Sequence, residues 1–151
     1  CLKIMAGAPK IKRLQLEVNQ ESETVLAGIA SAEPDYKLSL LINRKLGISL
    51  KSSNPLVIRD EKGQEAHFSR YLDTPAHHEG QSYELISNRS EKKFLLGKLR
   101  NIDYIFLINN VIGETEAENV LMGLRGTESV TGVFSIDHRS LKDKNLQYLI
   151  Q

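Results

Sequence analysis

Apolar residues are most concentrated between Phe94 and Asn109, where the sequence reads FLLGKLRNIDYIFLIN. The last part of this stretch, Tyr104 to Ile108, is rich in β-branched and aromatic residues. A short, nearly continuous apolar run of this kind is typical of a strand that is buried on both faces. We therefore predict a central strand over Tyr104 to Ile108, with Asp103 directly before it, and we expect the rest of the chain to pack around this strand.

Other segments alternate between apolar and polar residues, which is the pattern of a strand with one face exposed to water. The clearest are residues 10–18 (KIKRLQLEV) and residues 66–72 (AHFSRYL). Shorter strands are predicted at residues 48–51, 56–59, 82–88 and 128–136. The apolar segment Thr24 to Ile29 is too short for periodicity to distinguish a strand from the beginning of a helix.

Two segments carry apolar residues at helical spacing. The first follows Glu33-Pro34-Asp35, where proline in the first turn loses no hydrogen bond and Asp35 lies near the positive end of the helix dipole. Its apolar stripe consists of Tyr36, Leu38, Leu41, Ile42 and Leu46. Gly47 is a suitable residue to end this helix. The second helix is predicted between Gly113 and Gly126, because acidic residues crowd its first turn.

This order of elements predicts an α+β fold. Consecutive strands joined by short turns favour antiparallel pairing. Two helices among several such strands predict a mainly antiparallel sheet with both helices packed on one face. We expect residues 1–9 to form a flexible tail and residues 10–151 to form a single domain, since 151 residues suffice for one domain of ordinary size.

Composition narrows the classes of function. The chain has 20 basic and 19 acidic side chains, and this balance gives no electrostatic reason to expect nucleic acid or a membrane surface as the main partner. No apolar run reaches the roughly 18 residues of a membrane span. The only cysteine, Cys1, allows neither an intramolecular disulfide nor a thiolate metal cluster. We expect a cytoplasmic protein. A lipidated cysteine at the N-terminus is the alternative, although Met5 followed by Ala6-Gly7 resembles a translational start.

Few residues are candidates for chemistry. Asp103 and Tyr104 could line a pocket at the end of a strand; the structural interpretation is that Asp103 accepts backbone N–H groups while Tyr104 packs in the core, and we favour the latter. The histidines are His67, His77, His78 and His138. Neighbouring residues on an extended chain point to opposite faces, and no HExxH or CxxC spacing is present. We therefore expect surface histidines, no metal and no cofactor.

These observations predict a non-catalytic binding or protein-interaction module that contacts a protein partner or a second copy of itself. An exposed face or edge of the sheet is the expected contact surface. The candidate binding residues are Asp103, Tyr104, Tyr71, Tyr83 and Phe68.

Two other functions remain open. One is an RNA-associated accessory protein with a basic patch in the first third of the chain, formed by Lys10, Lys12, Arg13, Arg44 and Lys45. The other is a small enzyme in which Asp103 and a histidine meet in a pocket.

The segment Leu96 to Tyr104 (LGKLRNIDY) also resembles the signature of the IPExxxVDY family, which comprises small bacterial proteins without an established function. Ile102, Asp103 and Tyr104 match the end of the signature, whereas Gly97 and Lys98 stand where the family has proline and glutamate. Further similar segments are LQLEV, DYKLSLLINRKLG, YELISNRS and FSIDHRSLKDKNLQYLI, so the resemblance extends over almost the whole chain from Lys10. It implies a compact cytoplasmic single-domain protein and no particular reaction.

Overall fold

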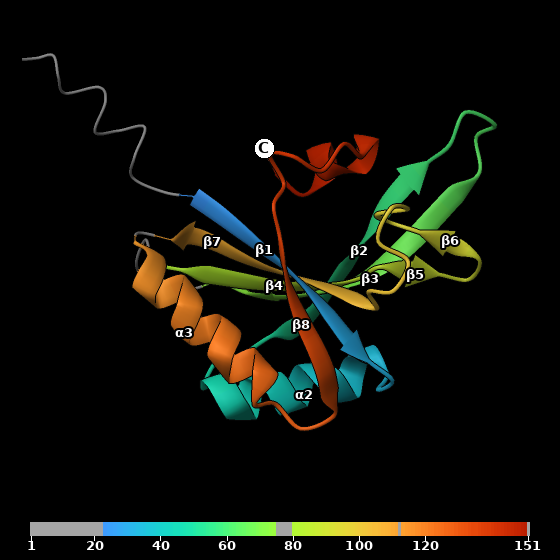
Figure 1. The fold of residues 1–151 in the computed structure, drawn as a ribbon. Coiled ribbons are helices and arrows are strands. Elements are labelled where there is room, and N and C mark those ends of the chain that lie inside the picture. The colour runs from blue at the N-terminus through green and yellow to red at the C-terminus, as the bar shows by residue number, and fades with distance from the viewer. Residues whose placement is uncertain (1–22, 75–79, 112, 151) are drawn as a thin grey trace, which may run out of the picture.

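The computed structural model describes residues 23–74, 80–111 and 113–150 (Figure 1). In chain order its elements are β1 (Glu23–Ser31), α2 (Asp35–Leu46), β2 (Lys51–Arg59), β3 (Glu65–Asp73), β4 (Ser82–Ser87), β5 (Arg89–Ser90), β6 (Lys93–Phe94), β7 (Tyr104–Val111), α3 (Glu114–Arg125), β8 (Val130–Ile136) and a short 3₁₀ helix, η1 (Lys144–Tyr148). The strands form a six-stranded sheet and a small two-stranded hairpin, β5–β6.

The predicted central strand is confirmed. The sheet order is β2-β3-β4-β7-β1-β8, and every neighbouring pair is antiparallel. β7 lies between β4 and β1, and its residues from Tyr104 to Ile108 are all buried. Residues buried on both faces need no polar alternation, which explains why this strand reads as an unbroken apolar run. The α+β prediction is confirmed as well.

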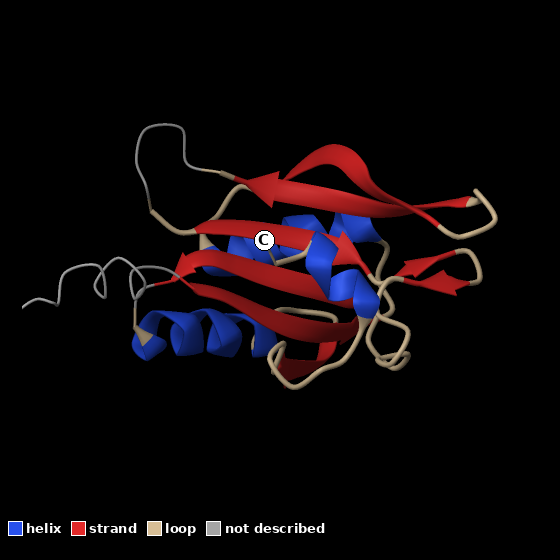
Figure 2. Cartoon of the chain, turned by 90° about the horizontal axis from the view of Figure 1, so that it is seen from above, coloured by secondary structure: helices blue, strands red, loops and turns tan. Residues whose placement is uncertain are grey.

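Both predicted helices are present, and both cover the same face of the sheet (Figures 1 and 2). Pro34 precedes α2, and Gly47 ends it in the left-handed conformation with a φ of 70°. α3 begins after Gly113 and ends at Gly126, as the sequence predicts. Leu38 and Leu124 from the two helices join Phe106 of β7 in one buried cluster. This cluster fixes both helices on the sheet.

The opposite face of the sheet has its own core. The loop of residues 95–103 and the C-terminal segment lie over it, and Figure 2 shows η1 on this side while α2 and α3 lie behind the sheet. Leu95 and Leu96 from the loop and Leu149 from the C-terminus pack against Ile105 and Leu107 of β7. The buried strand therefore supplies alternate residues to two cores.

The prediction of two short strands at residues 48–51 and 56–59 is wrong. The structure has one strand, β2, whose register against β3 shifts between Ser53 and Leu56. Because β2 is an edge strand, Pro55 needs no N–H group for the sheet and the strand continues through it. The ambiguous segment Thr24 to Ile29 belongs to a strand, β1.

Some predictions fall outside the described part of the chain. They are the tail of residues 1–9, the strand of residues 10–18 and the surface location of His77 and His78. Among the described residues, none of the helices has the length and apolar character needed to cross a membrane.

Candidate functional site

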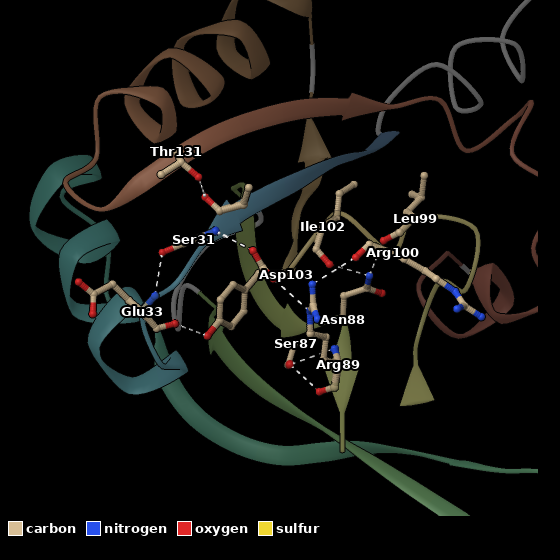
Figure 3. Close-up of polar contacts among 12 residues, drawn as sticks. Ser31, Glu33, Ser87, Asn88, Arg89, Leu99, Arg100, Ile102, Asp103 and Thr131 are labelled. Atoms are coloured by element: carbon tan, nitrogen blue, oxygen red, sulfur yellow. Dashed lines mark hydrogen bonds and ion pairs between the residues drawn. The ribbon is translucent and has the colours of Figure 1, made fainter. Parts of the chain in front are cut away.

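Asp103 lies where the chain turns into β7, and both of its carboxylate oxygens are engaged (Figure 3). Oδ2 accepts the backbone N–H of Ser31 at 2.9 Å, and Oδ1 lies 3.1 Å from Nε of Arg89. Tyr104 is 7% exposed and packs in the helix-side core. The structural interpretation of these two residues is therefore confirmed: Asp103 holds a backbone amide at a turn, and Tyr104 is a core residue.

The hydroxyl of Tyr104 joins β7 to the beginning of α2. It donates to the backbone carbonyl of Glu33 at 2.6 Å. Burial of the side chain, with smaller contributions from nearby carboxylates, raises the pKa of Tyr104 to about 12. The phenol is thus protonated at neutral pH, and its proton is held in the hydrogen bond to the Glu33 carbonyl. The hydroxyl is therefore a structural donor and is poorly suited to act as a catalytic acid or base.

Glu33 connects this turn to β8. Ser129 Oγ donates to Glu33 Oε2 at 2.7 Å, and this hydrogen bond is the main reason why the pKa of Glu33 lies below its ordinary range. Ser31 Oγ in turn donates to the carbonyl of Ser129 at 2.8 Å. One polar cluster therefore ties the end of β1 to the starts of β7, α2 and β8.

Asn88 is fully buried and organises the loop of residues 95–103 (Figure 3). Its Nδ2 donates to the carbonyls of Leu99 and Ile102, both at 2.9 Å, and its Oδ1 accepts the N–H of Leu96 at 2.8 Å. Sequence reasoning missed this residue. Its only signal is a polar residue at the end of the predicted strand YELISN.

Arg89 follows Asn88 and links the Asp103 turn to the β5–β6 hairpin. In addition to its ion pair with Asp103, its Nη2 donates to the carbonyl of Arg100 at 3.2 Å. Its guanidinium carbon lies 5.2 Å from the ring centre of Phe94, and that of Arg100 lies 5.4 Å from the same ring. Both distances are within cation–π range. The contacts of these two guanidinium groups with the Phe94 ring consequently hold the hairpin and the loop together.

The β5–β6 hairpin and the loop of residues 95–103 form one side of an open hollow of about 410 Å³, which we call the basic groove. Its floor is made by three apolar side chains of β2 and β3: Ile58, Ala66 and Phe68. Its walls come from the β5–β6 turn, the 95–103 loop and the C-terminal segment, namely Lys92, Lys93, Phe94, Gly97, Arg100, Lys144, Asn145, Gln147 and Tyr148. Arg59, Asp60 and Glu61 complete it at the β2–β3 turn.

The basic groove holds more positive charge than its neighbours neutralise. Arg59 is paired with Glu65, and Lys93 Nζ lies 3.3 Å from Asp60 Oδ2. Within the part of the chain that the structure describes, the remaining cations have no carboxylate partner; they are Lys92, Arg100 and Lys144. Cations without carboxylate partners above an apolar floor suit a ligand that carries both an anionic group and an apolar part.

The expectation that the candidate aromatic residues lie on one exposed face of the sheet is wrong. Phe68 is only 2% exposed and lies on the floor of the basic groove. Tyr71 and Tyr83 are half-buried against the opposite, helix-side core, where the Tyr83 ring lies 6.0 Å from that of Phe106. Phe68 and Tyr71 are an odd number of positions apart on β3, so they point to opposite faces of the sheet.

The structure gives no support to a pocket formed by Asp103 and a described histidine. His67 is an exposed residue of β3 that contacts Glu65, and His138 lies in the turn after β8. Neither contacts Asp103, whose oxygens bind Arg89 and Ser31 instead. His77 and His78 lie outside the described residues. Over residues 23–74, 80–111 and 113–150, no group of three or more histidine, cysteine or acidic side chains could hold a metal ion.

The alternative basic patch is described only in part. Arg44 and Lys45 lie in the last turn of α2, where they line a shallow hollow with Glu128. The other members of the patch, Lys10, Lys12 and Arg13, lie outside the described residues. The two described members of the patch therefore stand next to an acidic residue.

No protein-family model and no curated protein matches the chain. The resemblance to the IPExxxVDY family stays a prediction.

Proposed function

We propose that this chain is a non-catalytic binding module and that the basic groove is its binding site. The observation that carries the proposal is the convergence of Lys92, Arg100 and Lys144 above an apolar floor, without carboxylate partners in the described part of the chain. Ligand sites are usually concave and largely apolar, with a few polar groups that fix orientation. The volume of about 410 Å³ lies within the range of small-molecule sites.

Preorganisation of the walls supports the same function. The Lys92 side chain sits on the turn of the short β5–β6 hairpin, and Arg100 lies on a loop that Asn88 holds through three hydrogen bonds. Arg100 also lies over the Phe94 ring beside Arg89. A site whose charged groups are already held in place loses less conformational entropy when a ligand binds.

This proposal replaces the expected aromatic sheet surface, because Tyr71 and Tyr83 pack on the other face of the sheet. Of the candidate aromatic residues, Phe68 remains part of the proposed site, as its floor. Asp103 and Tyr104 do not line the groove: Asp103 pairs with Arg89 of the β5–β6 hairpin, and Tyr104 holds the carbonyl of Glu33 before α2.

The proposal predicts that an aromatic sulfonate, 8-anilinonaphthalene-1-sulfonate, binds the native chain at neutral pH and that the double variant Lys92→Gln/Lys144→Gln binds it about fivefold more weakly, since each exposed charge pair contributes about 0.2–1 kcal/mol. Affinity is measured by fluorescence titration. Added salt should weaken binding to the native chain more than binding to the variant, because screening acts on the removed charges.

The matched control is Arg44→Gln/Lys45→Gln, which removes the same charge from the end of α2. It should leave the affinity for the sulfonate unchanged. Equal loss in both double variants would show that only net charge matters, and loss in the control alone would place the site at α2; either result contradicts the proposal.

A further inference from the structure

We propose that the ligand of the basic groove is a free nucleoside phosphate whose base carries an exocyclic amino group. This inference rests on the proposed binding function and specifies the ligand by the groups that the groove presents. Three kinds of group are present: an exposed aromatic ring, a set of cations that have no carboxylate partner among the described residues, and polar side chains that have neither an ion pair nor a hydrogen bond there.

The aromatic ring is that of Tyr148, which stands in the wall of the groove and is 40% exposed. The other wall aromatic, Phe94, already has the guanidinium groups of Arg89 and Arg100 over its ring. Tyr148 is therefore the wall ring with room for a flat ligand. Stacking on an exposed aromatic side chain is how proteins commonly hold a nucleic-acid base, since every base has a π face.

The cations come from three separate segments: Lys92 from the β5–β6 turn, Arg100 from the 95–103 loop and Lys144 from the first position of η1. A phosphate group can accept hydrogen bonds on several sides at once, and it carries enough charge to engage more than one cation. Arg100 is suited to bidentate binding of phosphate because its guanidinium plane is held over Phe94.

The remaining polar groups suit the edge of a base. Glu61 at the β2–β3 turn has no cation partner in the described part of the chain, whereas its neighbour Asp60 is held by Lys93. A carboxylate without a partner accepts hydrogen bonds from an amino group. The amide of Gln147, next to Tyr148 on η1, offers a donor and an acceptor and makes no hydrogen bond among the described residues. Acceptor and donor together distinguish an amino-bearing base from uracil.

Glu61 also favours a free nucleotide over a residue within a strand. A single strand would bring further phosphates past the β2–β3 turn, where the Glu61 carboxylate would repel them. Single-strand binders instead line the path of the backbone with positive charge. The near-neutral chain, with a formal net charge of +1, gives no wider basic track for such a strand.

Isothermal titration calorimetry on the full chain tests the inference, with adenosine monophosphate as the probe. Adenosine, inorganic phosphate and uridine monophosphate should each bind about tenfold more weakly or worse, because each lacks at least one of the three recognised groups, which are the phosphate, the stacking base and its amino group. Tyr148→Phe should keep the affinity for adenosine monophosphate, whereas Tyr148→Ser should lower it about tenfold through loss of stacking. Circular dichroism confirms that each variant is folded.

The outcomes separate this inference from the proposed function. If the sulfonate binds at the groove but adenosine monophosphate does not, or binds no better than adenosine, the nucleotide is wrong while the binding function stands. If neither binds, both are wrong. A short oligoadenylate could also bind the basic groove more tightly than adenosine monophosphate does, with an affinity that falls steeply as salt is added. In that case the ligand is a single strand, and the proposal of a free nucleotide is wrong.

Discussion

Replacing Asn88 with alanine is expected to lower the free energy of unfolding by about 3–5 kcal/mol, because each buried polar group left without a partner costs about 1–3 kcal/mol. The N–H of Leu96 and the carbonyl of Ile102 lose their partner, whereas the carbonyl of Leu99 loses the Asn88 amide but still accepts the N–H of Ile102 at 3.2 Å. The Asn88 side chain is fully buried, so water cannot easily take its place. Urea denaturation followed by circular dichroism measures the change.

Asn101→Ala is the matched control, since Asn101 is an exposed residue of the same loop. It should change the free energy of unfolding by less than about 0.5 kcal/mol. An Asn88→Ala variant as stable as the control would show that the loop does not depend on this side chain, and the account of how the basic groove is supported would fail.

The second large effect concerns the close approach of β1 to the 95–103 loop at Gly28. A Cβ atom at this position would lie 2.8 Å from Cγ1 and 3.1 Å from Cγ2 of Ile102. Gly28→Ala should therefore destabilise the chain by about 1–3 kcal/mol through overpacking. Glycine-to-alanine changes without such a clash usually stabilise by about 0.4–1 kcal/mol, so the sign of the effect is itself informative.

The variant Ile102→Ala tests whether contact with the Ile102 side chain causes the destabilisation by Gly28→Ala. Alone it should cost about 2–5 kcal/mol, because Ile102 is buried and a cavity remains. In the double variant the new methyl group of residue 28 occupies part of that cavity, so the combined loss should fall short of the sum by about 1–2 kcal/mol. Gly97→Ala, where nothing lies within 4 Å of the added Cβ atom, is the control without a clash. Strictly additive losses would contradict the packing described here.

Elements with a clear apolar period could be predicted from the sequence. α2 and its end at Gly47 follow from helical spacing and a glycine that tolerates positive φ, and β7 follows from its unbroken apolar run. β2 was misjudged as two strands because Pro55 normally interrupts a strand, whereas an edge strand has no need of the missing N–H group. Whether a strand lies at an edge depends on the whole sheet and is not visible locally.

The role of Asp103 could be predicted because it depends on short-range geometry. A carboxylate before a strand commonly accepts a backbone N–H, and here it accepts that of Ser31. The partner could not be predicted, because Ser31 is brought to Asp103 by the pairing of β1 with β7. Arg89, the second partner, likewise comes from the β5–β6 hairpin, which the apolar and polar pattern of the sequence does not predict.

The basic groove could not be predicted, because three segments that are distant in the sequence form it: residues 58–68, 92–100 and 144–148. Lys92, Arg100 and Lys144 each look like an ordinary surface charge in the sequence. Their common location depends on the loop packing on the sheet face opposite the helices and on η1 lying over the same face. In addition, the nearly equal numbers of basic and acidic residues in the chain give no indication of a local excess of positive charge.

Amide chemical-shift mapping with the aromatic sulfonate is the most direct test of the claim that the basic groove is the binding site. The ¹H–¹⁵N spectrum of the full chain is recorded during titration with 8-anilinonaphthalene-1-sulfonate. The largest shifts are expected to cluster on Lys92, Phe94, Arg100 and the residues from Lys144 to Tyr148. Shifts concentrated instead on the end of α2 around Arg44 and Lys45, or spread without a cluster, would contradict this claim.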